Sequence, residues 1–108
     1  MSGVKHNKGK PMMDLIDYDH VVKMAETLTK AYLTGKYSKF NWRNGIPVSE
    51  LFAATMRHLA EFSQRRDIDP ESGLLHIHHA ATDLMMLYCM LRDRPDLDDR
   101  YDKDNKIS

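Results

Sequence analysis

Apolar residues recur at helical spacing in three stretches of the chain, and polar, turn-forming segments separate these stretches. They cover about residues 17–35, 47–65 and 74–92. In each of them the apolar positions fall three or four residues apart, as they do on one face of an α-helix. No segment of useful length alternates with the period of a strand. The pattern predicts an all-α fold, a small domain of three helices.

Residues at the ends of these stretches agree with helix boundaries. Asp17 or Asp19 can cap the first helix, and Gly35 can stop it. Pro47 suits the first position of the second helix. The third helix is apolar on most sides in its second half, which is typical of a central helix or of a helix between subunits.

The chain divides into a single helical domain, residues 12–94, and two polar ends. Residues 1–11 are rich in Lys, Gly and Asn and have little to bury, so we predict a flexible N-terminal segment. Residues 95–108 form a charged C-terminal tail that we expect to be solvated. In this tail Leu97 and Tyr101 are available to dock on a neighbour.

Length and charge narrow the class of protein. A chain of 108 residues buries roughly 60–68% of its surface as a monomer, which leaves a modest core and favours a homo-oligomer. The 16 basic residues balance the 16 acidic ones. No net charge therefore attracts the chain to a nucleic acid polymer or to an anionic membrane.

The remaining composition indicates a cytoplasmic protein. The single cysteine, Cys89, has no partner for a disulfide within the chain, which indicates a reducing compartment. No stretch approaches the roughly 18 consecutive apolar residues of a membrane span. The basic N-terminus lacks the apolar segment of a signal peptide.

Histidines and carboxylates lie in stripes on the second and third predicted helices. His76, His79 and Asp83 share one face of the third, and His58 and Glu61 share one face of the second. If the two helices pack side by side, all five groups can point into one cleft. Imidazole and carboxylate groups bind divalent metals, and helix pairs often build such sites.

Three uses of this stripe remain open. His58, His76, His79 and Asp83 can hold a divalent metal such as Mg²⁺, Mn²⁺ or Zn²⁺. Without a metal, His58, Glu61, His79 and Asp83 can act as catalytic acid, base and orienting groups, or His58 or His79 can be a cationic donor to a phosphate. Alternatively, the histidines serve only the structure and are satisfied by backbone or carboxylate oxygens.

The segment between the first two helices offers contacts for a nucleotide. Aromatic rings alternate loosely with cations there, so that rings can stack on a base and cations can bind phosphates. Alternatively, Phe40 and Trp42 plug the open end of the core while the cations stay in water. The predicted ligand-binding residues are Lys36, Tyr37, Lys39, Asn41, Trp42, Arg43, Arg57 and His76.

Several short motifs follow one another along most of the chain. They are Gly9-Lys10-Pro11, Asp14-Leu15-Ile16, Gly35-Lys36-Tyr37, Asn41-Trp42-Arg43, Gly45-Ile46-Pro47, Arg57-His58-Leu59, Asp69-Pro70-Glu71-Ser72-Gly73 and His76 to Ala80. The ordered series covers residues 9 to about 91 and is more specific than any one motif. Through this ordered series of motifs the chain resembles the phage-encoded family of dATP/dGTP diphosphohydrolase N-terminal domains, the group associated with the MazZ enzymes.

The resemblance implies an all-α protein of phage or prophage origin that acts on nucleotides in the host cytoplasm. The implied reaction cuts a purine deoxynucleoside triphosphate to the monophosphate and pyrophosphate. MazG-type pyrophosphohydrolases hold Mg²⁺ with a Glu-x-x-Glu pair on one helix and a Glu-x-x-Asp pair on another. Here the corresponding helices carry His58-x-x-Glu61 and Ala80-x-x-Asp83, so the acidic metal motif is not intact.

Two functions are therefore predicted. One is a nucleotide-binding diphosphohydrolase that uses the histidine and carboxylate stripe. The other is a non-catalytic oligomeric sponge that sequesters a nucleotide-derived immune signal, an anti-defence role that needs only rings, cations and histidine donors.

Overall fold

A computed structural model describes residues 3–4, 6 and 8–104, and within them the fold is helical. The elements are η1 (Met13–Leu15), α1 (Tyr18–Leu33), η2 (Asn41–Asn44), α2 (Val48–Ser63), α3 (His76–Asp93) and η3 (Pro95–Leu97), where η denotes a short 3-10 helix. No named strand occurs in the described part of the chain. The prediction of three helices is confirmed, with their ends within two residues of those expected.

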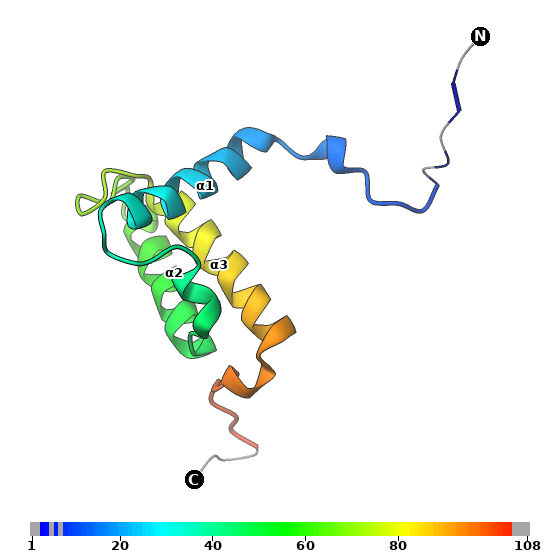
Figure 1. Ribbon diagram of the computed structural model, residues 1–108. Helices are drawn as coiled ribbons and strands as arrows, with labels where there is room; N and C mark the ends of the chain where they lie inside the picture. Colours follow the sequence, from blue (N-terminus) through cyan, green and yellow to red (C-terminus); the bar gives the residue numbers. More distant parts are fainter. Residues whose placement is uncertain (1–2, 5, 7, 105–108) are drawn as a thin grey trace.

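Helices α2 and α3 form an antiparallel pair, and α1 crosses the N-terminal half of α3 (Figure 1). The hydrophobic core lies where α2 begins and α3 ends. Its buried residues are Val48, Leu51 and Met90, and Trp42 is among the half-buried side chains packed against them. The opposite end of the pair, where α2 ends and α3 begins, is therefore left for polar groups.

The start of the tail folds back on the core. Leu97 in η3 packs against the core cluster of its own chain, whereas Tyr101 is 82% exposed. The backbone N–H of Ser49 donates to Asp99 Oδ1 at 2.8 Å, and the Ser49 hydroxyl donates to Asp99 Oδ2 at 2.6 Å. Asp99 thus satisfies a backbone donor in the first turn of α2, which is left free because Pro47 offers no side-chain cap.

Parts of both terminal predictions fall outside this description. Residues 1–2, 5, 7 and 105–108 lie outside the described residues. Within the described ranges, none of the helices combines the length and the apolarity needed to cross a membrane.

Candidate functional site

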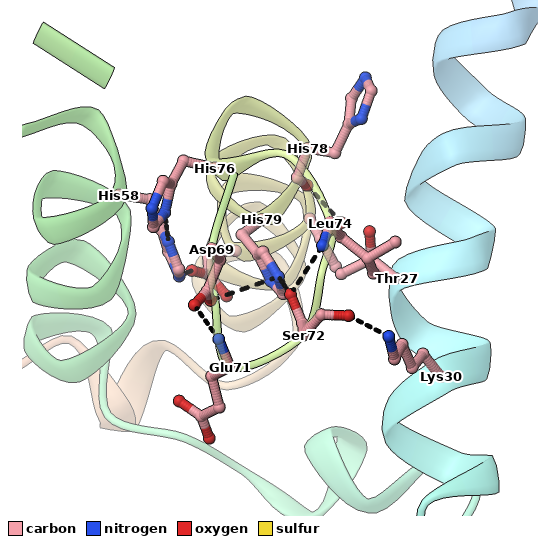
Figure 2. A network of polar contacts seen from close by, with 12 residues as sticks. Thr27, Lys30, His58, Asp69, Glu71, Ser72, Leu74, His76, His78 and His79 are labelled. Carbon is pink, nitrogen blue, oxygen red and sulfur yellow. Dashed lines mark hydrogen bonds and ion pairs between the residues drawn. The ribbon is translucent and has the colours of Figure 1, made fainter. Parts of the chain in front are cut away.

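The predicted stripe converges at the polar end of the helix pair. His58 on α2 faces His76 and His79 in the first turn of α3 (Figure 2). Its Nδ1 lies 2.8 Å from His76 Nδ1, and its ring stacks on that of His79 with centroids 4.7 Å apart and planes 10° apart. Asp83 lies one turn further along, with Oδ2 4.0 Å from His58 Nε2. Four of the five stripe residues therefore meet.

The loop between α2 and α3 adds two side chains that were not predicted as site residues. Asp69 Oδ2 lies 3.6 Å from His79 Nε2, and Ser72 Oγ lies 2.7 Å from the same nitrogen (Figure 2). The sequence marked Asp69-Pro70-Glu71-Ser72-Gly73 as a turn, and this motif also carries the family resemblance. Because these residues are typical of a turn, the sequence did not indicate that Asp69 and Ser72 also contact His79.

Local backbone hydrogen bonds fix this loop. Asp69 donates its N–H to the carbonyl of Leu74 at 2.8 Å, and His76 donates to the carbonyl of Asp67 at 2.8 Å. The side chain of Asp69 accepts from the N–H of Glu71 at 2.9 Å, as in a turn stabilised by its own Asp. Gly73 has φ +75°, a left-handed conformation that glycine adopts without strain. The loop is consequently held against the start of α3.

Two lysines also bind this loop. Lys30 on α1 donates to the carbonyl of Ser72, and Lys36 forms an ion pair with Glu71 at 3.2 Å. Figure 2 shows Lys30 reaching the loop from α1. Lys36 was predicted as a ligand contact, whereas Lys30 was not, because its position on a helix gave no signal. Both place positive charge beside the histidine cluster.

Burial sets the protonation of the cluster. Desolvation lowers the pKa of His58, and the neighbouring His79 and His76 lower it further. Desolvation also lowers the pKa of His79, although Asp69 acts in the opposite direction. Burial raises the pKa of Asp83 to about 6, although Arg57 acts to lower it. At neutral pH the imidazoles of His58 and His79 are therefore uncharged and have a lone pair to offer.

The structure does not bring every predicted residue to this cluster. Glu61 forms an ion pair with Arg66 and is 40% exposed, although its carboxylate still interacts electrostatically with His76. Trp42 packs on the core at the opposite end of the helix pair, with the Arg43 guanidinium 4.4 Å from its ring centre. A shared cavity of Trp42 and the histidines is not formed, because the connecting segment closes the other end of the core.

The other predicted binding residues in this segment lie at the surface. Tyr37, Lys39, Asn41 and Arg43 are exposed, as is Arg57 on α2. Tyr37 is 51% exposed and directly follows Lys36, which places an accessible ring next to the cation nearest the cluster. A separate cavity of about 190 Å³ is lined by Phe62, Asp67, Leu75 and Ile77 and shares no lining residue with the cluster.

The sequence matches the family model described as "dATP/dGTP diphosphohydrolase, N-terminal" over residues 1–100. The chain belongs to this family. The resemblance stated from its motifs is thereby confirmed. A protein named dATP/dGTP diphosphohydrolase from Salmonella phage PMBT28 is 38% identical over 100 residues, which cover 93% of this chain and 33% of that protein. The phage source of this relative supports the predicted phage origin.

The chain spans about a third of the length of that relative. No solved structure matches the present chain significantly.

Proposed function

We propose that this chain is a nucleotide-binding domain of the dATP/dGTP diphosphohydrolase type, with its binding site at the histidine cluster. The observation that carries the proposal is the meeting of His58 and His79 with a loop flanked by Lys30 and Lys36. The ammonium groups of the two lysines are donors suited to phosphate oxygens. The family membership favours a purine deoxynucleoside triphosphate as the ligand.

Tyr37 is the ring that we assign to the base. It is exposed and adjoins Lys36, so that one ring and one cation lie side by side. Stacking of a base on an aromatic side chain contributes about 1–3 kcal/mol. The half-buried position of Trp42 suits it less well for this role.

A more specific form of the proposal is that the histidine cluster itself catalyses the hydrolysis. His58 or His79 would act as a base, because a neutral imidazole can take a proton from an attacking water. Glu61 is less suited to a catalytic role because it is paired with Arg66.

A second candidate function is sequestration of a nucleotide-derived signal without turnover. The cluster contains histidines where MazG-type enzymes carry acidic Mg²⁺ ligands, and Mg²⁺ prefers oxygen ligands. This substitution favours binding over catalysis by the chain alone. The pairing of the chain with a catalytic segment, as the greater length of the relative allows, would reconcile binding here with hydrolysis elsewhere.

The test is a panel of purine and pyrimidine nucleoside and deoxynucleoside triphosphates, incubated with the purified chain with and without Mg²⁺, Mn²⁺ or Zn²⁺. Chromatography of the products and of the ligand released on denaturation separates the two functions. Monophosphate and pyrophosphate that disappear in His79→Ala support the enzyme, whereas an intact nucleotide recovered from the protein supports sequestration. Neither turnover nor retention of any nucleotide would contradict both.

A matched pair of variants locates the site. Lys36→Gln removes the cation beside the cluster, and Lys23→Gln removes an exposed lysine that pairs with Glu26 on α1. We expect Lys36→Gln to weaken nucleotide binding about tenfold, the loss of one charge-assisted hydrogen bond, and Lys23→Gln to leave it unchanged. Equal effects of the two substitutions would place the phosphates elsewhere.

A further inference from the structure

Three side chains from three segments present metal-binding atoms to one another. They are His58 on α2, Asp69 in the loop and His79 on α3, and one ligand atom of each lies within 4.8 Å of the other two. His79 Nε2 and Asp69 Oδ2 are 3.6 Å apart. Zinc binds nitrogen and oxygen at about 2.0–2.2 Å, so that donors around a tetrahedral ion lie roughly 3.3–3.6 Å apart. Small side-chain shifts would bring the set to this spacing.

We propose that His58, Asp69 and His79 bind one divalent transition-metal ion, with Zn²⁺ as the best fit. This inference goes beyond the proposed function because it requires no nucleotide. It also differs from the metal ligands expected from the sequence. Asp69 supplies the carboxylate, and His76, whose Nδ1 contacts Nδ1 of His58, is not one of the three proposed ligands.

His76 orients the first imidazole. Because Nδ1 of His58 and Nδ1 of His76 share one hydrogen bond of 2.8 Å, one of these nitrogens carries the proton and the other accepts it. When His58 donates, its Nε2 keeps the lone pair that a metal needs. Metal-binding histidines are commonly fixed in this way by a partner on the other ring nitrogen.

Ser72 orients the second imidazole. Its Oγ accepts from the N–H of Leu74 at 3.1 Å, so its hydroxyl hydrogen can be donated to His79 Nε2 at 2.7 Å. That arrangement places a lone pair, and not a proton, on the nitrogen that faces Asp69. Metal binding would replace the Ser72 hydrogen bond at the same atom.

The loop fixes the carboxylate. One oxygen of Asp69, Oδ1, accepts from the N–H of Glu71 at 2.9 Å. The other, Oδ2, is the atom that faces His79. Asp69 is half-buried, with its side chain 16% exposed. Its charge therefore has a hydrogen-bonded anchor on one side and a free ligand atom on the other.

The donor set selects the class of ion. Two imidazoles and one carboxylate suit Zn²⁺, Mn²⁺, Fe²⁺ or Ni²⁺, and Mg²⁺ binds such nitrogen-rich sites poorly. Three protein ligands leave positions open for water or for an oxygen of a ligand. The ion would also join α2, the loop and α3, and would therefore stabilise the folded chain against unfolding.

The test titrates the full chain, freed of metal with a chelator, with Zn²⁺ in a calorimeter and with Co²⁺ in a spectrophotometer, in the absence of nucleotide. We expect one ion per chain, a Co²⁺ visible absorption band and a higher melting temperature with Zn²⁺. Absence of saturable uptake would overturn the proposal, whatever the nucleotide experiments show.

Asp69→Asn tests the carboxylate because the amide oxygen can still accept from the N–H of Glu71. We expect it to lower Zn²⁺ affinity more than about 100-fold, beyond the range seen when an outer partner is lost. His79→Gln, a second variant in case Asp69→Asn does not fold, should do the same. The matched control is His78→Asn, on the same helix but with its ring against His20 at 5.8 Å. If the first two variants bind Zn²⁺ as tightly as this control, the assignment is wrong.

Discussion

At the scale of single residues, burial decides what the polar side chains of α3 can do. Asp83 is 20% exposed, and no described lysine or arginine forms an ion pair with it, whereas Asp93 on the same helix lies 2.8 Å from the Arg92 guanidinium. The pKa of Asp83 is therefore raised to about 6 by desolvation, and the pKa of Asp93 is lowered by its hydrogen bond to Arg92. The pKa values of two aspartates on one helix are thus shifted in opposite directions.

We predict that Asp83→Asn stabilises the chain above pH 6. Between the unfolded pKa of about 3.9 and the folded pKa of about 6, the folded state retains a proton that the unfolded state has released. The unfolding free energy of the parent chain therefore falls as pH rises through this window. The Asp83→Asn variant has no carboxyl group at this position, so its unfolding free energy does not fall for this reason. Because the carboxyl is partly exposed, we expect a gain of only about 1 kcal/mol above pH 6.

Urea unfolding at pH 4 and pH 7.5, with a chelator present, measures this difference. The variant should match the parent chain at pH 4 and exceed it at pH 7.5. The lowered pKa values of His58 and His79 make both proteins less stable in acid, and this shared effect cancels in the comparison. Asp93→Asn is the control and should bring no gain. An equal gain in the two variants would show that burial of Asp83 is not the cause.

At the scale of elements, the ends of the helices hold the molecule together through contacts that are distant in sequence. Helix α2 begins after Pro47 without a side-chain cap of its own, and the tail supplies Asp99 instead. Helix α3 begins at a loop closed by hydrogen bonds between the 67–69 and 74–76 segments and clasped by Lys30 from α1. Both ends of the helix pair consequently depend on a segment outside it.

We predict that Asp99→Ala lowers the melting temperature, because it leaves the Ser49 N–H and hydroxyl without their acceptor. Loss of a helix cap typically shifts the midpoint of a domain of this size by roughly 4–8 °C. Thermal unfolding followed by circular dichroism measures it. The control is Asp96→Ala, whose partner Arg94 lies only two residues away in the chain, and it should have a much smaller effect. If both variants melt alike, the tail does not cap α2.

At the scale of the whole molecule, the chain buries little for its length. Val48, Leu51, Ala80, Cys89 and Met90 are the buried hydrophobic residues among those described. The radius of gyration is 17.6 Å, compared with about 13 Å for a compact chain of this size. Large apolar side chains remain exposed on both long core helices, including Phe52, Met56, Leu84 and Tyr88. Such a chain gains stability by covering these side chains with another surface.

The homo-oligomer expected from the sequence therefore stays a prediction, and the exposed side chains support it. Light scattering coupled to size-exclusion chromatography should give a multiple of 12.6 kDa, and the melting temperature should rise with protein concentration. A Phe52→Lys variant should shift the mass toward the monomer, whereas Lys103→Gln in the tail should not. A monomeric mass at all concentrations, with a melting temperature independent of concentration, would contradict the prediction.

The sequence by itself determined the three helices and the stripe of histidines. Both follow from spacing along the chain, and spacing on a helix fixes which side chains share a face. It also predicted that His58 and His79 would share one cleft if the second and third helices packed side by side. It did not predict the ion pair of Glu61 with Arg66, which depends on how α2 ends.

Only the tertiary structure decided which groups complete the site. Asp69 and Ser72 lie in a loop without periodicity, so their approach to His79 depends on the hydrogen bonds that fold the loop back onto α3. The tertiary structure also decided that Trp42 lies apart from the histidines. An aromatic side chain in a connecting segment goes where the core has room, and here that room is at the opposite end of the helix pair.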